Sequence, residues 1–171
     1  MAEETRNNSH GYTLFEILIV MAILGVILGI GAINYNSYTK KQVITQEGLT
    51  LKDALRNAAT NASSGQKPVG ITCTHLLGYQ VSFTANTYST QAMCDPDAPD
   101  APTHTVTLNP LISFNPVPAS ILFRVLNRGV ITSPIHTASQ SASLTLTSVD
   151  NSRSFLMSIG SDGSVSIIGL Q

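Results

Sequence analysis

The chain has 171 residues, the length of about one domain. Charged residues make up 11% of it, against roughly 25% in an ordinary soluble domain, and the formal net charge is −1. This balance argues against a nucleic-acid-binding protein, and two cysteines are too few for a four-thiolate zinc site or a disulfide-dense scaffold.

The first predicted element is a long apolar helix. Residues 12–33 contain a single charged side chain, Glu16. As a helix this run would span the roughly 30 Å hydrocarbon core of a bilayer, and it is longer than the apolar core of about 7–15 residues in a secretory signal peptide. We therefore predict a transmembrane segment. A charge at mid-membrane costs about 3 kcal/mol, so Glu16 is either tolerated near the interface or a functional group that needs a partner.

The helical pattern continues beyond Ile33 as a narrow apolar stripe. Its members recur at spacings of three and four: Ile44, Gly48, Leu51, Leu55, Ala58, Ala59 and Ala62. Five charged residues of this segment lie off the stripe: Lys40, Lys41, Lys52, Asp53 and Arg56. We predict one helix of about 75 Å from Tyr12 to Ala62, ended by Ser63-Ser64-Gly65 and Pro68. Its second part, residues 34–65, should pack against a globular head.

That head, residues 66–171, is predicted to consist of strands and loops. Runs of β-forming residues predict strands at 69–74, 79–84, 105–108, 121–126, 143–147, 155–159 and 165–168. Asp150-Asn151 predicts a turn, and Asp162-Gly163 between two apolar runs predicts a β-hairpin. Three prolines in residues 95–102 predict a loop. The predicted fold class is α+β, with the long N-terminal helix packed on an antiparallel β-sheet head.

The start of the apolar run carries a family resemblance. The string His10-Gly11-Tyr12-Thr13-Leu14-Phe15-Glu16 and the apolar residues after it resemble the class III signal of type IV pilins and pseudopilins. The resemblance implies that residues 1–11 are a leader, that prepilin peptidase cuts between Gly11 and Tyr12, and that Tyr12 becomes N-methylated. It also implies a single-pass protein of the inner membrane, with its head outside the cytoplasm, that assembles into a filament.

The remainder of the chain resembles the GspH/FimT-type minor pseudopilins and pilins. The matching features are Leu55-Arg56-Asn57-Ala58 in the helix, a first head strand at 69–73, Ile121-Leu122-Phe123 leading to Arg128-Gly129, and a last hairpin at 153–167 turning through Gly163. Three features differ. Ile33 stands in the region where many pilins have a proline near the end of the apolar part. The leader carries Glu3, Glu4 and only Arg6, and Ser164-Val165-Ser166 stands where DNA-uptake members have arginines.

Two features of the apolar run acquire roles from this resemblance. Glu16 would meet the amine of Tyr12 on a neighbouring subunit, which supplies the opposite charge that a buried carboxylate needs. The spacing Gly25-x-x-x-Gly29 either lets two helices approach closely or is a chance pattern in an apolar run.

Cys73 and Cys94 have two interpretations. In an oxidising compartment outside the membrane they would form a disulfide, closing a loop of about 20 residues and stabilising the head by about 3 kcal/mol. The alternative is two separate buried thiols.

No catalytic or metal-binding pattern stands out. Asp95, Asp97 and Asp100 resemble a calcium loop only superficially, because prolines interrupt them and a bidentate Glu is missing, so we expect no metal. The histidines that follow the predicted helix lie in no ligand spacing and are expected on the surface: His75, His104 and His136. We expect no enzyme activity and no cofactor.

These observations predict a structural subunit, a minor pseudopilin or pilin of a type II secretion system or a type IV pilus. The implied partners are prepilin peptidase, other pilin-like subunits, an inner-membrane assembly platform and membrane lipid. The alternative is a membrane-tethered receptor that captures a ligand such as DNA. Without the leader the chain has eight basic residues (nine less Arg6) and eight acidic ones (ten less Glu3 and Glu4), so nucleic acid is not an expected partner.

Overall fold

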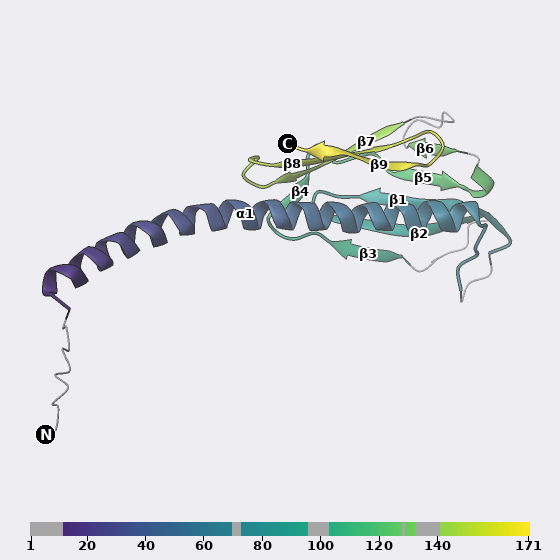
Figure 1. Ribbon diagram of the computed structural model, residues 1–171. Helices are drawn as coiled ribbons and strands as arrows, with labels where there is room; N and C mark the ends of the chain where they lie inside the picture. Colours follow the sequence, from purple (N-terminus) through teal and green to yellow (C-terminus); the bar gives the residue numbers. More distant parts are fainter. Residues whose placement is uncertain (1–11, 70–72, 96–102, 128, 133–140) are drawn as a thin grey trace, which may run out of the picture. The chain divides into compact units, whose positions relative to one another are not determined.

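The computed structural model describes residues 12–69, 73–95, 103–127, 129–132 and 141–171; for residues 30–36 it describes the backbone alone. The chain forms two compact units, residues 1–39 and residues 40–171. One helix, α1 (Leu14–Ser63), contributes to both (Figure 1). The predicted helix is confirmed, and its ends differ from the predicted ones by two residues at the start and one at the end.

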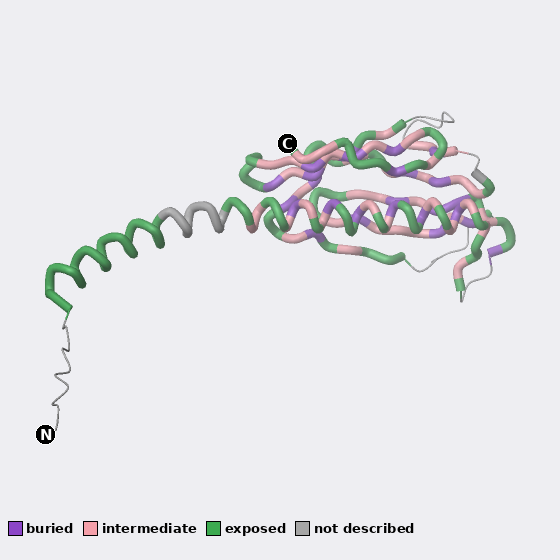
Figure 2. Tube along the Cα trace, viewed as in Figure 1, coloured by how far each residue is buried: buried purple, intermediate pink, exposed green. Residues whose placement is uncertain are grey.

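In the N-terminal unit, the described side chains of α1 are not buried. All side chains described between residues 12 and 29 are exposed (Figure 2). Within the part of the chain that the structure describes, no helix combines the length and apolar character needed to cross a membrane.

In the C-terminal unit, α1 buries the predicted stripe. Figure 2 shows buried and exposed positions alternating along this part of the helix. Ile44, Leu51 and Leu55 have no exposed surface, and Ala58 and Ala62 are 1% exposed. Full burial of one leucine side chain stabilises a fold by about 1.5–3 kcal/mol, so this stripe attaches the helix firmly to the head.

Within its described residues the head contains nine strands in two antiparallel sheets, which confirms the α+β class. The five-stranded sheet has the order β3-β2-β1-β5-β6 and the four-stranded sheet the order β4-β7-β8-β9. The strands are β1 (His75–Phe83), β2 (Thr87–Asp95), β3 (His104–Thr107), β4 (Ile112–Phe114), β5 (Ile121–Arg124), β6 (Val130–Thr132), β7 (Ala142–Ser148), β8 (Ser154–Ile159) and β9 (Val165–Leu170). Buried side chains from α1 and from both sheets form one hydrophobic core.

The helix approaches the four-stranded sheet closely at Gly48. A Cβ atom at this position would lie 2.6 Å from the Phe155 ring of β8, nearer than real Cβ atoms come to other groups. Phe155 is 3% exposed, so its ring has little room to move. The stripe therefore needs a glycine at this point for a steric reason.

The first head strand differs from the prediction. The prediction placed it at 69–74, but Val69 lies in a turn, Cys73 and Thr74 precede β1, and residues 70–72 are outside the described ranges. The strand runs from His75 and takes in most of the predicted 79–84. Cys73 and Thr74 belong instead to the segment that leads into the sheet.

Three strands were missed, and one was predicted too long. β2 is rich in polar residues and buries only Tyr88, Ala92 and Cys94, so its alternation is hidden in a sequence of small and hydroxylated side chains. β4 and β6 have three residues each, too few for a periodic signal. The predicted strand 121–126 ends at Arg124, because Val125–Asn127 form a 3₁₀ turn.

Both predicted turns of the four-stranded sheet are confirmed. Asp150 and Asn151 turn the chain between β7 and β8, and Asn151 has φ 53°. Gly163 has φ 86° in the hairpin between β8 and β9, a backbone conformation that glycine adopts without steric cost. Asp162 supports this hairpin, since its Oδ1 accepts hydrogen bonds from Ser164 N–H at 3.0 Å and Ser164 Oγ at 2.7 Å. These bonds lower the pKa of the Asp162 carboxyl.

Candidate functional site

The start of α1 carries the residues of the predicted processing and assembly site. Thr13 caps the helix: its carbonyl accepts hydrogen bonds from the N–H groups of Glu16 at 3.1 Å and Ile17 at 3.3 Å, and its Oγ1 accepts from Glu16 N–H at 3.3 Å. Gly11 lies outside the described residues. Tyr12 is 78% exposed, and Glu16 is exposed one turn into the helix.

The surface around Glu16 is apolar and continuous. From Tyr12 to Leu28, the described large hydrophobic side chains are between 43% and 83% exposed. A patch of this extent on one helix is covered by lipid or by another chain in a stable state. The Glu16 carboxylate, at the positive end of the helix dipole, is the one charge in this stretch.

The two glycines of the apolar run have no packing role within the chain. A Cβ atom at Gly25 or at Gly29 would meet nothing within 4 Å. Close approach to a helix of another subunit therefore stays a prediction, and Gly48, which does need to be glycine, belongs to the other unit.

Cys73 and Cys94 are joined in a disulfide, as predicted, with their Cα atoms 5.6 Å apart. Each cysteine is 7% exposed. The bond connects the segment just before β1 to the end of β2.

The structure brings no metal-binding group together among the residues it describes. His75 and His104 are exposed at the starts of β1 and β3, and Asp95 is exposed at the end of β2. His136, Asp97 and Asp100 lie outside the described residues.

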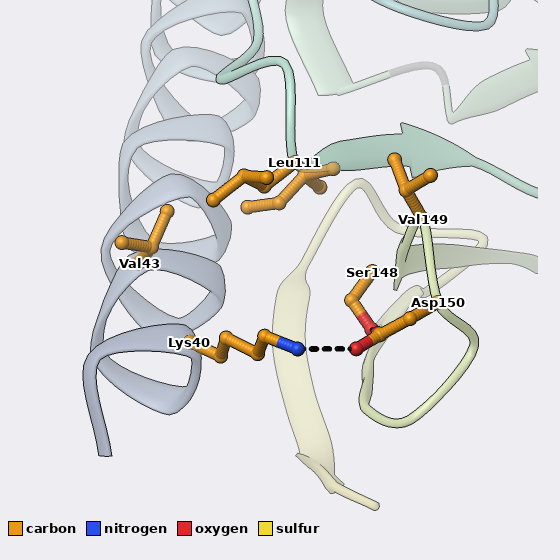
Figure 3. A pocket seen from close by; sticks show the side chains of 7 residues that line it. Lys40, Val43, Leu111, Ser148, Val149 and Asp150 are labelled. Carbon is orange, nitrogen blue, oxygen red and sulfur yellow. Dashed lines mark hydrogen bonds and ion pairs between the residues drawn. The ribbon is translucent and has the colours of Figure 1, made fainter. Parts of the chain in front are cut away.

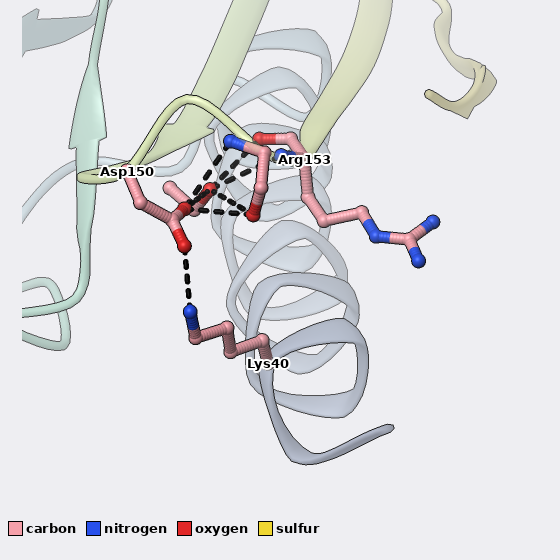
Figure 4. Close-up of polar contacts among 5 residues, drawn as sticks. Lys40, Asp150 and Arg153 are labelled. Atoms are coloured by element: carbon pink, nitrogen blue, oxygen red, sulfur yellow. Dashed lines mark hydrogen bonds and ion pairs between the residues drawn. The ribbon is translucent and has the colours of Figure 1, made fainter. Parts of the chain in front are cut away.

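A polar cluster on the turn between β7 and β8 was not predicted. Lys40 Nζ lies 2.6 Å from Asp150 Oδ2 in an ion pair (Figure 4). Asp150 Oδ1 accepts hydrogen bonds from Ser148 Oγ at 2.6 Å, Ser152 Oγ at 2.7 Å and Ser152 N–H at 3.2 Å. The hydrogen bond from Lys40, followed by those from Ser148 and Ser152, holds the pKa of the Asp150 carboxyl far below its usual range.

A cavity of about 230 Å³ adjoins this ion pair (Figure 3). Its lining residues are Lys40 and Val43 from α1, Leu111 and Ile112 at the start of β4, and Ser148, Val149 and Asp150 from the β7 end. Apart from the ion pair and Ser148, the side chains that line the cavity are aliphatic. The cavity could not be predicted from the spacing of residues in the sequence, because Lys40 and Asp150 are 110 residues apart.

Two tyrosines of the five-stranded sheet have a raised pKa because burial disfavours the phenolate. Tyr79 donates its hydroxyl to the Gln66 carbonyl at 2.9 Å, which ties β1 to the segment after the helix. Tyr88 is 2% exposed, and the negative charge of Glu47 adds to the effect of burial. Its hydroxyl has no hydrogen-bond partner among the described residues.

Comparison with known families finds a match at the N-terminus. Residues 6–32 match the family described as a prokaryotic N-terminal methylation motif. The matched range includes Gly11, Tyr12, Glu16 and most of the apolar run, and it ends before the head. No curated protein matches the chain, and no solved structure does. The motif supports the type IV pilin and pseudopilin superfamily, and it implies processing by prepilin peptidase and assembly with other pilin subunits.

Proposed function

We propose that this chain is a minor pseudopilin or minor pilin, a structural subunit of a type II secretion pseudopilus or a type IV filament, of the GspH/FimT type. The observation that carries the proposal is the methylation motif at residues 6–32, at the head of an exposed apolar helix. The same helix, α1, continues into a disulfide-bonded β-sheet head. A subunit of this kind acts by assembly and catalyses no reaction.

In this proposal the apolar part of α1 inserts into the inner membrane, and prepilin peptidase at the cytoplasmic face cuts after Gly11. Tyr12 becomes the N-methylated first residue, and an inner-membrane platform assembles the subunit with other pilin-like chains. The Cys73–Cys94 disulfide supports a head outside the cytoplasm, because structural disulfides form and persist in oxidising compartments.

Glu16 has a specific place in this assembly. The Tyr12 amine of the same chain points away along the helix axis, so the partner that fits is the Tyr12 amine of a staggered neighbour. Within one subunit the carboxylate is tolerable, because a helix N-terminus favours negative charge by about 0.3–1 kcal/mol. In the filament core, an unpaired carboxylate or amine costs about 3–5 kcal/mol, which makes the pair a condition for entry.

Replacement of Glu16 tests the proposal. Glu16→Leu should insert into the membrane and lose its leader normally, yet it should fail to crosslink to other pilin-like subunits. Glu16→Gln keeps the shape without the charge and should be the milder defect. Glu47→Gln, on the second part of α1, is the control and should assemble normally. Wild-type crosslinking and transport in Glu16→Leu would show that Glu16 is only a tolerated charge.

The leader gives an independent test of processing. Gly11→Val should leave residues 1–11 attached, because the peptidase must accommodate a small residue at the cut. Intact mass of membrane-purified protein distinguishes the two forms. Wild-type protein that keeps its leader in the presence of the matching peptidase would contradict the proposed cleavage.

A further inference from the structure

The rim of the cavity beside Lys40 exposes apolar side chains that the head does not use. Leu111 is 53% and Val149 is 63% exposed. The two residues are neighbours, since Val149 N–H donates to the Leu111 carbonyl at 2.9 Å. With Val43 and Lys40 they border the cavity, and we call these four residues the rim (Figure 3).

The chain holds the rim close to the end of the apolar run. Lys40 lies seven positions after Ile33 in the sequence, and α1 is helical throughout this stretch. Seven helical residues extend about 10 Å, and the polar layer on each side of the hydrocarbon core is about 5–8 Å thick. This distance follows from chain connectivity alone and holds for any arrangement of the two units.

The residues next to the rim are the types that anchor proteins at bilayer surfaces. Tyr38 is 68% exposed, and Lys40 is followed by the exposed Lys41. Tyrosine and lysine are favoured at the membrane–water interface, where an apolar stem and a polar tip each find a suitable medium. Asp150 is the acidic residue at the cavity, and Lys40 neutralises it, which leaves Lys41 to face lipid phosphates.

We propose that the rim docks on the outer surface of the bilayer, with Leu111 and Val149 entering the headgroup layer. This inference rests on the proposed membrane insertion of residues 12–33. A second copy of the chain is the other possible occupant. However, a stable interface buries about 800 Å² on each partner, and two side chains and a small cavity offer much less. A bilayer contact needs little affinity of its own, because the membrane anchor already keeps the head beside the lipid at high effective concentration.

Tryptophan fluorescence tests the docking, because the chain contains no tryptophan. The full-length Val149→Trp protein would be reconstituted at low density into phosphatidylethanolamine–phosphatidylglycerol vesicles with lipids brominated close to the headgroup. We expect about twofold quenching, as for apolar side chains that enter the interface. The control is Val69→Trp, a 90% exposed site after the far end of α1, which should be unaffected. Adding Leu111→Asp to Val149→Trp should abolish the quenching.

A third variant separates this inference from the proposed function. Leu24→Trp lies in the apolar run and should be quenched by lipids brominated deep in their acyl chains. If Leu24→Trp is not quenched, membrane insertion itself is wrong. If it is quenched while Val149→Trp behaves like Val69→Trp, insertion stands and the docking is overturned. Emission from Val149→Trp that changes only as protein density rises would assign the rim to a second copy and would also overturn the docking.

Discussion

The two parts of α1 share one helical backbone and differ in what their side chains meet. From Leu14 to Leu28, the described large hydrophobic side chains are all exposed. From Ile44 to Ala62, the stripe residues are almost completely buried in the core of the head, except Ala59, which is partly buried. The first part has an apolar surface on every side, whereas the second has one apolar stripe between charged faces.

Because of this difference, the two parts of α1 should contribute differently to the free energy of unfolding of the head. The second part depends on contacts within the chain, so changes there should alter the free energy of unfolding of the head. The described side chains of the first part are exposed, so changes there should alter insertion or assembly while the head stays intact. Matched substitutions in the two parts test whether their contributions to stability are separate.

The largest effect is expected from a matched pair of leucine truncations. Leu55→Ala removes a fully buried side chain and should lower the free energy of unfolding by about 2–5 kcal/mol. Leu24→Ala, at a 47% exposed position, should change it by less than about 0.5 kcal/mol. Urea unfolding of the detergent-solubilised protein, followed by circular dichroism, measures both. Equal losses would mean that the first part of α1 also packs on the head.

Removal of the disulfide should follow in size. Cys73→Ala/Cys94→Ala should destabilise the head by about 3 kcal/mol, because the bond no longer restricts the unfolded chain. The membrane-bound fraction should stay as in wild type, since the bond lies wholly within the head. Peptide mapping without reductant should recover the Cys73–Cys94 pair from wild-type protein, and free thiols in its native compartment would contradict the assignment.

The same substitution, glycine to alanine, can be compared in the two parts of α1. Gly48→Ala forces the Phe155 ring to shift and should cost about 1–3 kcal/mol of head stability. Gly29→Ala meets nothing within the chain and should stabilise the helix by about 0.5–1 kcal/mol. Adding Phe155→Leu should recover part of the Gly48→Ala loss. A loss of subunit crosslinking in Gly29→Ala, with the head intact, would support a packing role for Gly25 and Gly29.

The Lys40–Asp150 pair predicts a smaller, pH-dependent effect where the two parts of α1 meet. The pKa of Asp150 is lowered in the folded state, so its stabilising contribution is complete above the unfolded value of about 3.9 and declines as the pH falls below it. Wild type should therefore be more stable than Asp150→Asn at pH 7, by a margin that shrinks toward pH 3. Lys40→Met should show a smaller loss at pH 7, because the hydrogen bonds from Ser148 and Ser152 to Asp150 remain, and Asp53→Asn is the exposed control. If the stability difference between wild type and Asp150→Asn is the same at pH 7 and pH 3, the Asp150 carboxylate does not stabilise the fold.

The smallest signal is expected for DNA binding, which should not rise above background. The sequence has three basic residues after Lys67, which are Arg124, Arg128 and Arg153, and counterion release needs clustered cations. The solubilised protein at about 50 mM salt should bind DNA at about millimolar affinity or weaker. Micromolar, salt-sensitive binding would favour a receptor instead of a structural subunit.

Prediction from sequence succeeded where the signal was local. The helix and its stripe follow from a period of three to four residues, and the Asp162-Gly163 hairpin follows from the backbone freedom of glycine. It failed where the signal depended on partners. The strand β2 is recognisable only from its pairing with β1 and β3, because it buries few side chains among many polar ones.

The candidate site divides along the same line. Gly11, Tyr12 and Glu16 could be singled out in advance, because they lie in one contiguous string, which falls within the matched residues 6–32, and because a lone charge stands out in an apolar run. The cavity and the Asp150 ion pair could not. Asp150 reads as an ordinary turn residue and Lys40 as an ordinary surface charge until the fold places them 2.6 Å apart.

From the amino-acid sequence it could be predicted that one helix has an apolar and an amphipathic part, that a β-rich head follows, and that the N-terminus carries a pilin-like motif. These features depend on composition and on short spacings along the chain. Only the fold shows how the described strands divide into two sheets, that Cys73 and Cys94 come within bonding distance, and that Gly48 leaves room for the Phe155 ring. These depend on contacts between residues far apart in the chain, which packing selects and local propensity does not encode.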